Sequence, residues 1–182
     1  MKILQLAVLF LTFLLGVLPI AASAQPFTIS ADAREVTDQK TGLIWRRCPE
    51  GMVYSSDTCT GTASTFTYDE ALQQAATQAS STGIDWRLPT VKELVGMTNK
   101  SLDNLKVDSV AFPATPPGKF WSATIYYLSS HYAWSVEFTP GFAVSAWYNQ
   151  FGYGVTAPAH LTFSNYVRLV RDGQLHAIDS AQ

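Results

Sequence analysis

The sequence predicts an α+β domain: two helices, antiparallel strands and long loops. Three observations predict this class. Two capping-box sequences open helical segments in the first half of the chain. Alternating apolar and polar residues mark strands in the second half. The composition also changes at Ser109, because residues 109–166 hold 15 of the 21 aromatic residues that follow residue 24 but only two charged residues.

The first 24 residues have the pattern of a secretory signal peptide. Lys2 supplies a positive start, residues 3–18 are apolar and uncharged, and Ala22–Ala24 has the small-x-small form of a cleavage site. We expect cleavage after Ala24, which leaves a single domain over residues 25–182 with its core at about residues 38–171. An uncleaved membrane anchor is the alternative, because the apolar run approaches the roughly 20 residues that span a bilayer.

The charge of the remaining chain excludes some partners. Residues 25–182 carry 11 Lys and Arg against 14 Asp and Glu, a net charge of −3. This composition offers no basic excess for a nucleic acid, and the chain has no low-complexity tract and no repeat. Export predicts a secreted, periplasmic or cell-surface protein with no integral membrane segment after cleavage.

Local signals place the first elements. Two short strands, Glu35–Asp38 and Leu43–Arg46, surround a turn in which Gly42 supplies a positive φ. The capping boxes predict helices that begin after Thr67 and Thr90 and run to about residues 80 and 99.

Aromatic strands follow in the second half. Tyr132–Phe138 alternates, with its large apolar residues on one face and Ala, Ser and Glu on the other, so it predicts a half-buried strand. Phe142–Tyr148 predicts a second alternating strand. Asn149–Asn165 has no period and predicts a long loop, and Val167–Arg171 predicts a short closing strand.

Cys48 and Cys59 are the only cysteines of the chain. In an exported protein we expect them to form an intramolecular disulfide that closes a polar, turn-rich loop. A reactive thiol or a metal ligand is the alternative, but neither a base nor further ligands lie nearby in the sequence.

The connector between the two helices carries Asp85, Trp86 and Arg87 in succession. A carboxylate and a guanidinium beside an indole allow a binding site. The structural interpretation is favoured, in which Asp85 and Arg87 satisfy loop carbonyl and amide groups and Trp86 fills the core. Trp121 and Trp134 lie in apolar strand patterns and are also expected in the core.

The order of short motifs along the chain points to a known family. The motifs run from about residue 38 to residue 171 and are Thr41-Gly42-Leu43, Glu70-Ala71, Asp85-Trp86-Arg87-Leu88-Pro89-Thr90, Phe120-Trp121-Ser122-Ala123-Thr124, Ala133-Trp134 and Val167-Arg168-Leu169-Val170-Arg171. This series resembles the Lcl C-terminal domain family, named for the C-terminal domain of the Legionella collagen-like adhesin. The resemblance implies an exported bacterial domain of C-type-lectin-like α+β architecture, from a family whose naming adhesin binds sulfated glycosaminoglycans.

The sequence departs from that family in three respects. It has no collagen-like Gly-x-y region, which removes that route to a trimer. Leu169 stands where a Cys is common in the family, so a bridge between Cys48 and Cys59 would be a local replacement. The net negative charge gives no basic field for a polyanion.

The sequence predicts no catalytic residue, no metal and no cofactor. Its histidines at 131, 160 and 176 are too scattered for a metal motif, and no nucleophile motif occurs. A triad of distant residues stays open, because such sites are defined by geometry. Calcium-dependent sugar binding needs several carboxylates, and the aromatic half offers Glu137 alone.

The surplus of aromatic residues in loops predicts a binding surface for a glycan or a cell-surface protein. The candidate ligand-binding residues are Tyr126, Tyr127, His131, Trp147, Tyr148 and Tyr153. The alternative for each ring is that it covers the core. Lys40, Arg46 and Arg47 form a small basic group that is expected to add an anionic contact.

The sequence therefore predicts an exported, non-enzymatic, adhesin-like binding module. A structural or assembly subunit of a surface or envelope complex is the first alternative, and a hydrolytic enzyme is the second. Whether the chain forms a homo-oligomer stays open.

Overall fold

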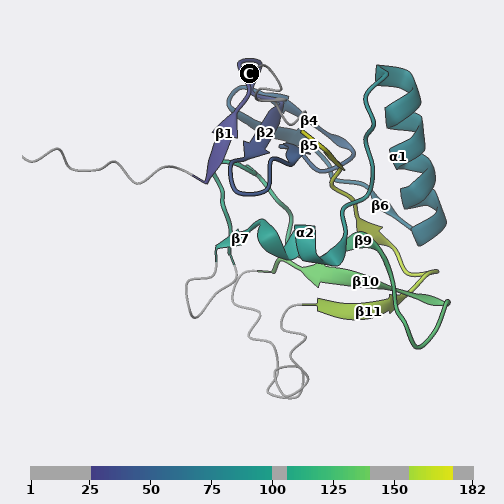
Figure 1. Cartoon of the computed structure of the whole chain (residues 1–182). Coiled ribbons are helices and arrows are strands. Elements are labelled where there is room, and N and C mark those ends of the chain that lie inside the picture. Colours follow the sequence, from purple (N-terminus) through teal and green to yellow (C-terminus); the bar gives the residue numbers. More distant parts are fainter. Residues whose placement is uncertain (1–25, 100–105, 140–155, 174–182) are drawn as a thin grey trace, which may run out of the picture.

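The computed structural model describes residues 26–99, 106–139 and 156–173, and these form two main sheets, two helices and two small hairpins (Figure 1). The predicted α+β class is confirmed. The predicted strand Phe142–Tyr148 and the predicted ligand residues Trp147, Tyr148 and Tyr153 lie outside these ranges. In the described part of the chain, no helix is long and apolar enough to cross a membrane.

The first sheet has four antiparallel strands in the order β1-β2-β3-β13. Their bounds are β1 Phe27–Ile29, β2 Glu35–Asp38, β3 Ile44–Arg46 and β13 Val170–Arg171. The predicted turn between β2 and β3 is confirmed, and Gly42 has a φ of 74° there. The strand β1 was not predicted, because three residues are too few to show a period.

The segment between the two cysteines, predicted only as a polar, turn-rich loop, is a β-hairpin. Strands β4 (Met52–Ser55) and β5 (Thr58–Gly61) pair directly across a two-residue turn. Ser56 and Asp57 both have positive φ, 51° and 64°, as a type I′ turn requires. The predicted disulfide between Cys48 and Cys59 is confirmed, with a Cα–Cα distance of 5.5 Å.

The second sheet has five strands in the order β11-β10-β9-β12-β6. Their bounds are β6 Thr65–Phe66, β9 Lys119–Ile125, β10 Tyr132–Glu137, β11 Thr156–His160 and β12 Asn165–Tyr166. The prediction of a loop over Asn149–Asn165 is wrong for residues 156–160, which pair with β10. Pro158 argued against a strand here, because proline has no N–H to donate. Strand β11 lies at the sheet edge, however, where a missing N–H is tolerated.

Two helices cover opposite faces of the second sheet. Phe120 and Trp121 are neighbours on β9, so their side chains point to opposite faces. Helix α1 (Tyr68–Thr82) packs its buried residues against Trp121, and α2 (Val91–Gly96) packs Leu94 near Phe120. The second helix is shorter than predicted, since the chain continues into the small hairpin of β7 (Thr98–Asn99) and β8 (Lys106–Val107).

The middle of strand β10 is buried on both faces, so the prediction of a half-buried strand is wrong for residues 133–136. Ala133 and Ser135 are 0% and 1% exposed, although their small side chains resemble those of a solvent face. Ser135 donates its hydroxyl to the Ala157 carbonyl at 2.9 Å, which satisfies it inside the sheet. The helices over the two faces bury the small residues Ala133 and Ser135 as fully as Val136, whereas Tyr132 at the start of the strand stays 38% exposed.

A buried arginine links distant chain segments by donating hydrogen bonds to main-chain carbonyls. Arg168 is fully buried, and its Nη1 donates to the carbonyls of Arg46, at 3.0 Å, and of Arg47. Its Nη2 donates to Thr115 Oγ1 at 2.8 Å. Burial lowers the pKa of Arg168. This side chain joins the C-terminal segment to the strand β3 and to the loop before β9.

The predicted basic group is wrong for two of its members. Arg47 is 4% exposed and donates to three carbonyl oxygens, those of Ala33, Val110 and Ala111. Arg46 forms an ion pair with Glu50 at 3.0 Å. These arginines are used inside the fold, so neither offers a free charge to an anionic ligand.

Candidate functional site

The turn between β9 and β10 brings two chain segments together at one end of the second sheet. Within it, Tyr126 N–H donates to the Tyr132 carbonyl at 2.8 Å, which closes the hairpin. Leu161 N–H donates to the His131 carbonyl at 3.0 Å. The connection between β11 and β12 therefore lies beside this turn.

One aromatic group comes from the turn and from β10. The ring of Tyr126 lies 5.2 Å from Tyr127 and 5.4 Å from Trp134, measured between centroids. Tyr127 is 73% exposed and Leu128 is 66% exposed, whereas Trp134 is buried. Trp134 anchors a group whose outer members face solvent.

A second aromatic group crosses from β10 to β11. Tyr132 and His160 are direct register partners, and their ring centroids are 5.2 Å apart at an interplanar angle of 89°. Phe163 lies 6.1 Å from His160 and is 60% exposed. Because Tyr132 and Trp134 are two residues apart on one strand, they face the same side of the sheet, and the two groups adjoin.

We call this surface the aromatic end, and its members share a position at the β9–β10 turn or beside it. They are Tyr126, Tyr127, Leu128, Tyr132, Trp134, His160 and Phe163. The segments that build it, residues 121–135 and 156–163, contain no Asp, Glu, Lys or Arg. The surface therefore offers ring faces, hydroxyls and an imidazole, but no formal charge from these segments.

The structure brings together only some of the predicted ligand residues. Tyr126 and Tyr127 belong to the aromatic end, Tyr126 half-buried and Tyr127 exposed. His131 is exposed, and its backbone carbonyl rather than its ring makes the contact that holds the turn. The histidine that packs among the rings is His160, which sequence reasoning missed because its cross-strand partner becomes visible only once residues 156–160 are known to form a strand.

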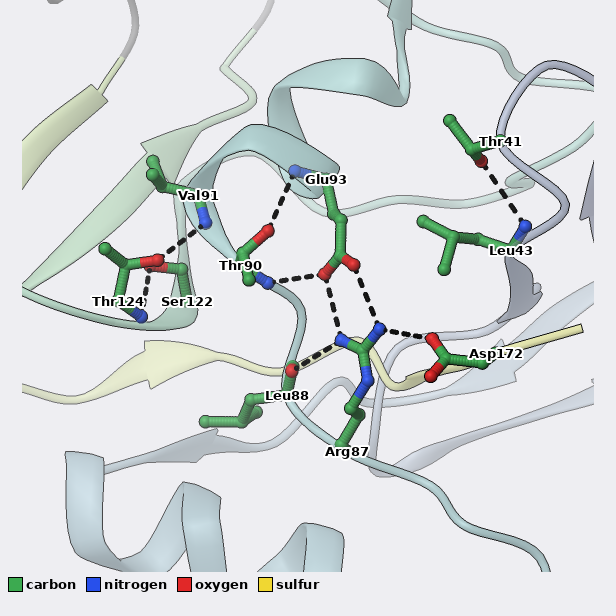
Figure 2. A network of polar contacts seen from close by, with 10 residues as sticks. All are labelled: Thr41, Leu43, Arg87, Leu88, Thr90, Val91, Glu93, Ser122, Thr124 and Asp172. Atoms are coloured by element: carbon green, nitrogen blue, oxygen red, sulfur yellow. Dashed lines mark hydrogen bonds and ion pairs between the residues drawn. The ribbon is translucent and has the colours of Figure 1, made fainter.

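Arg87 holds three segments together through polar contacts, as Figure 2 shows. Its guanidinium donates two 2.9 Å hydrogen bonds to the Glu93 carboxylate and one of 2.7 Å to Asp172. Glu93 also accepts from the Thr90 N–H at 2.7 Å, which caps α2. The expected role of Asp85 at the helix start is wrong, since Asp85 is exposed and Glu93 does this work.

The pKa shifts of Glu93 and Arg87 agree with the ion pair between them. Burial would raise the pKa of Glu93, but the hydrogen bonds from Arg87 and Thr90 and the Arg87 charge lower it below its ordinary value. Hydrogen bonding to Glu93 in turn raises the pKa of Arg87. Trp86 is buried beside them, with the guanidinium groups of Arg46 and Arg171 at 4.9 and 5.6 Å from its ring.

One carboxylate outside this network also accepts hydrogen bonds from its own neighbour. Glu137, the one carboxylate of the aromatic half, accepts from the hydroxyl and the N–H of Thr139. In residues 26–99, 106–139 and 156–173, no group of three or more His, Cys, Asp and Glu residues lies close enough to hold a metal ion.

Comparison with protein-family models matches the Lcl C-terminal domain over residues 34–171, which is more than half of the chain. This chain belongs to the Lcl C-terminal domain family. No curated protein and no solved structure matches it. The aromatic end lies inside the matched range, and the Lcl C-terminal domain family suggests an adhesin-related module. Membership and the Cys48–Cys59 disulfide are consistent with an exported protein.

Proposed function

We propose that this Lcl C-terminal domain is an exported, non-enzymatic binding module that recognises a glycan or a cell-surface protein through the aromatic end. In this proposal residues 1–24 are a signal peptide removed after Ala24, and residues 25–182 are the mature domain. The two sheets, two helices and long connections are also compatible with a C-type-lectin-like architecture.

The observation that carries the proposal is where the exposed apolar side chains lie. Nine large hydrophobic residues are exposed in the described part of the chain, and five of them lie at or beside the β9–β10 turn. These five are Ile125, Tyr127, Leu128, Tyr132 and Phe163. A cluster of exposed apolar groups is typical of an interaction site, whereas scattered ones are ordinary.

The chemistry of these side chains suits a partner with both apolar and polar surface. Tyrosine rings bury a large area with little loss of side-chain freedom and keep a hydroxyl for hydrogen bonding. Trp134 behind them is held in the core, which keeps Tyr126 in place. The surface is therefore partly ordered before any partner binds, which lowers the entropic cost of binding.

The test is a binding comparison with residues 25–182 on a glycan array and on whole cells. Tyr127→Ala is expected to weaken binding about tenfold or more, as truncation of a central aromatic residue does at interfaces. Val53→Ala is the matched control, because Val53 is 65% exposed on the β4–β5 hairpin, in a different sheet. Equal binding by the Tyr127 variant and the wild type would contradict the proposal.

An assembly subunit is the second candidate, and Leu128 favours it. An aliphatic side chain that is 66% exposed suits a protein interface better than a sugar. Light scattering on the mature protein distinguishes the two functions. An oligomer that dissociates in Leu128→Ser would favour assembly, and a monomer that still binds its ligand would favour the module.

A further inference from the structure

We propose that Tyr132, His160 and Phe163 form a subsite for an uncharged sugar ring, in which His160 Nε2–H donates a hydrogen bond to a sugar hydroxyl. This inference rests on the proposed function and narrows its ligand to one chemical class. Its residues differ from Tyr127, so the two proposals can fail separately.

The hydrogen bonds of His160 decide which ring nitrogen carries the proton. Thr162 N–H donates to Nδ1 at 3.3 Å, and the Thr162 hydroxyl lies 2.8 Å from the same nitrogen. A nitrogen that accepts an N–H bond cannot itself carry a hydrogen, so the neutral ring is protonated at Nε2. The contact with Thr162 therefore fixes both the tautomer and the orientation of the ring.

The Nε2–H donor is left for a ligand. Across residues 26–99, 106–139 and 156–173, it has no hydrogen-bond partner. The imidazole is half-buried, and it stands edge-to-face against Tyr132. A donor on a ring that is held in one orientation is more selective than a free surface hydroxyl, because it has already lost its rotational freedom.

The flanking rings provide the apolar part of the subsite. Phe163 is 60% exposed and Tyr132 is 38% exposed, so both keep ring surface for contact. Sugars present a face of C–H groups beside their hydroxyls, and such a face packs on an aromatic ring while a hydroxyl reaches a polar neighbour. Phe163 and His160, with centroids 6.1 Å apart, are close enough to serve both parts of one sugar ring.

The absence of charge sets the ligand class. The segments that build the subsite have no Lys or Arg, so a sulfate or carboxylate group would lose its hydration without gaining a cation. A neutral hydroxyl has no such penalty. The subsite therefore favours neutral hexoses and N-acetylhexosamines over sulfated polysaccharides.

The test is calorimetry of residues 25–182 with neutral glucose, galactose and N-acetylglucosamine oligomers at up to about 10 mM, with heparin as the charged comparison. At least one neutral oligomer is expected to bind. Phe163→Ala and His160→Ala are each expected to weaken that binding about tenfold, and His160→Gln, which keeps an N–H donor, is expected to recover part of it. Val110→Ala, at a site 71% exposed in another loop, is expected to bind as the wild type does.

Two results would overturn the subsite. One is no binding of any neutral oligomer, and the other is neutral-sugar binding that Phe163→Ala and His160→Ala leave unchanged. If a different ligand binds and Tyr127→Ala abolishes that binding, the proposed function stands without the sugar subsite. If Tyr127→Ala also has no effect on any ligand, the proposed function fails as well.

Discussion

The two regions of this domain use their polar groups in opposite ways. In the first sheet and its loops, charged side chains form contacts within the domain. Arg47 donates to three carbonyls, Arg46 pairs with Glu50, and Arg171 pairs with Glu35. At the aromatic end the building segments contain no charged residue, and rings face solvent.

Because of this difference, charge content alone would not have led to the candidate site. The arginines at 46 and 47 look like ligand contacts in the sequence, yet the structure uses both to hold loops together. The segments of the aromatic end carry no charged residue, yet Tyr127 and Phe163 are 73% and 60% exposed. The first region is therefore expected to govern stability and the second to govern binding, and each prediction below tests that division.

The largest expected effect on stability comes from the buried arginine. Arg168→Met removes the guanidinium that donates to the Arg46 and Arg47 carbonyls and to Thr115, so the two carbonyls lose this buried donor. The free energy of unfolding is expected to fall by about 3 kcal/mol or more in urea titrations. Lys92→Met, at an exposed position, is the control and is expected to change it by less than about 0.5 kcal/mol. Equal stabilities of the two variants would break the comparison.

Removal of the disulfide is expected to cost slightly less. The double variant Cys48→Ser and Cys59→Ser frees a loop with a sequence separation of 11 residues, so the chain-entropy model predicts a loss of about 3 kcal/mol. Thermal unfolding with and without reductant measures it. Ligand binding at the aromatic end is expected to persist in the folded variant, and a selective loss of binding would show that the hairpin contributes to the site.

A smaller, pH-dependent effect is expected at the cap of α2. Glu93→Gln weakens the pairing with Arg87 and is expected to destabilise the domain by about 1 kcal/mol near neutral pH, a modest value because Arg87 is partly exposed. The pKa of Glu93 is lowered in the folded state, so its contribution is full above its ordinary value of 4.5 and is lost as the pH falls below that. The stabilities of variant and wild type should therefore converge in acid, and a constant difference down to about pH 3 would contradict the ion pair.

The smallest expected effect on stability lies at the aromatic end. Tyr127→Ala is expected to change the free energy of unfolding by less than about 0.5 kcal/mol, because the ring is 73% exposed. Chemical denaturation measures this change. A loss above about 2 kcal/mol would assign the ring to the core and remove it from the binding surface.

Local sequence signals correctly predicted the elements that are determined by interactions between neighbouring residues. The turn at Gly42, the helix starts after Thr67 and Thr90, and the bond between Cys48 and Cys59 all follow from neighbouring residues and the expected compartment. One element that depends on a distant partner was missed. Strand β11 was predicted as a loop because it contains Pro158 and shows no period, and it forms by pairing with β10.

The same limit explains the candidate site. Tyr126 and Tyr127 were identified because loop aromatics are visible in the sequence, but His131 was chosen where the structure places His160 among the rings. That choice needed the register between Tyr132 and His160, which the sequence does not contain. The burial of Arg47 was hidden for a similar reason, because its acceptor Ala111 lies 64 residues away.

The most direct test of the division between the two regions is amide chemical-shift mapping by NMR on the mature protein, titrated with whichever ligand the binding assays identify. We predict that the shifted amides lie in residues 125–134 and 158–164, around Tyr127, His160 and Phe163. Shifts that concentrate in the Cys48–Cys59 hairpin or in β1 to β3, with the aromatic end unchanged, would contradict the account.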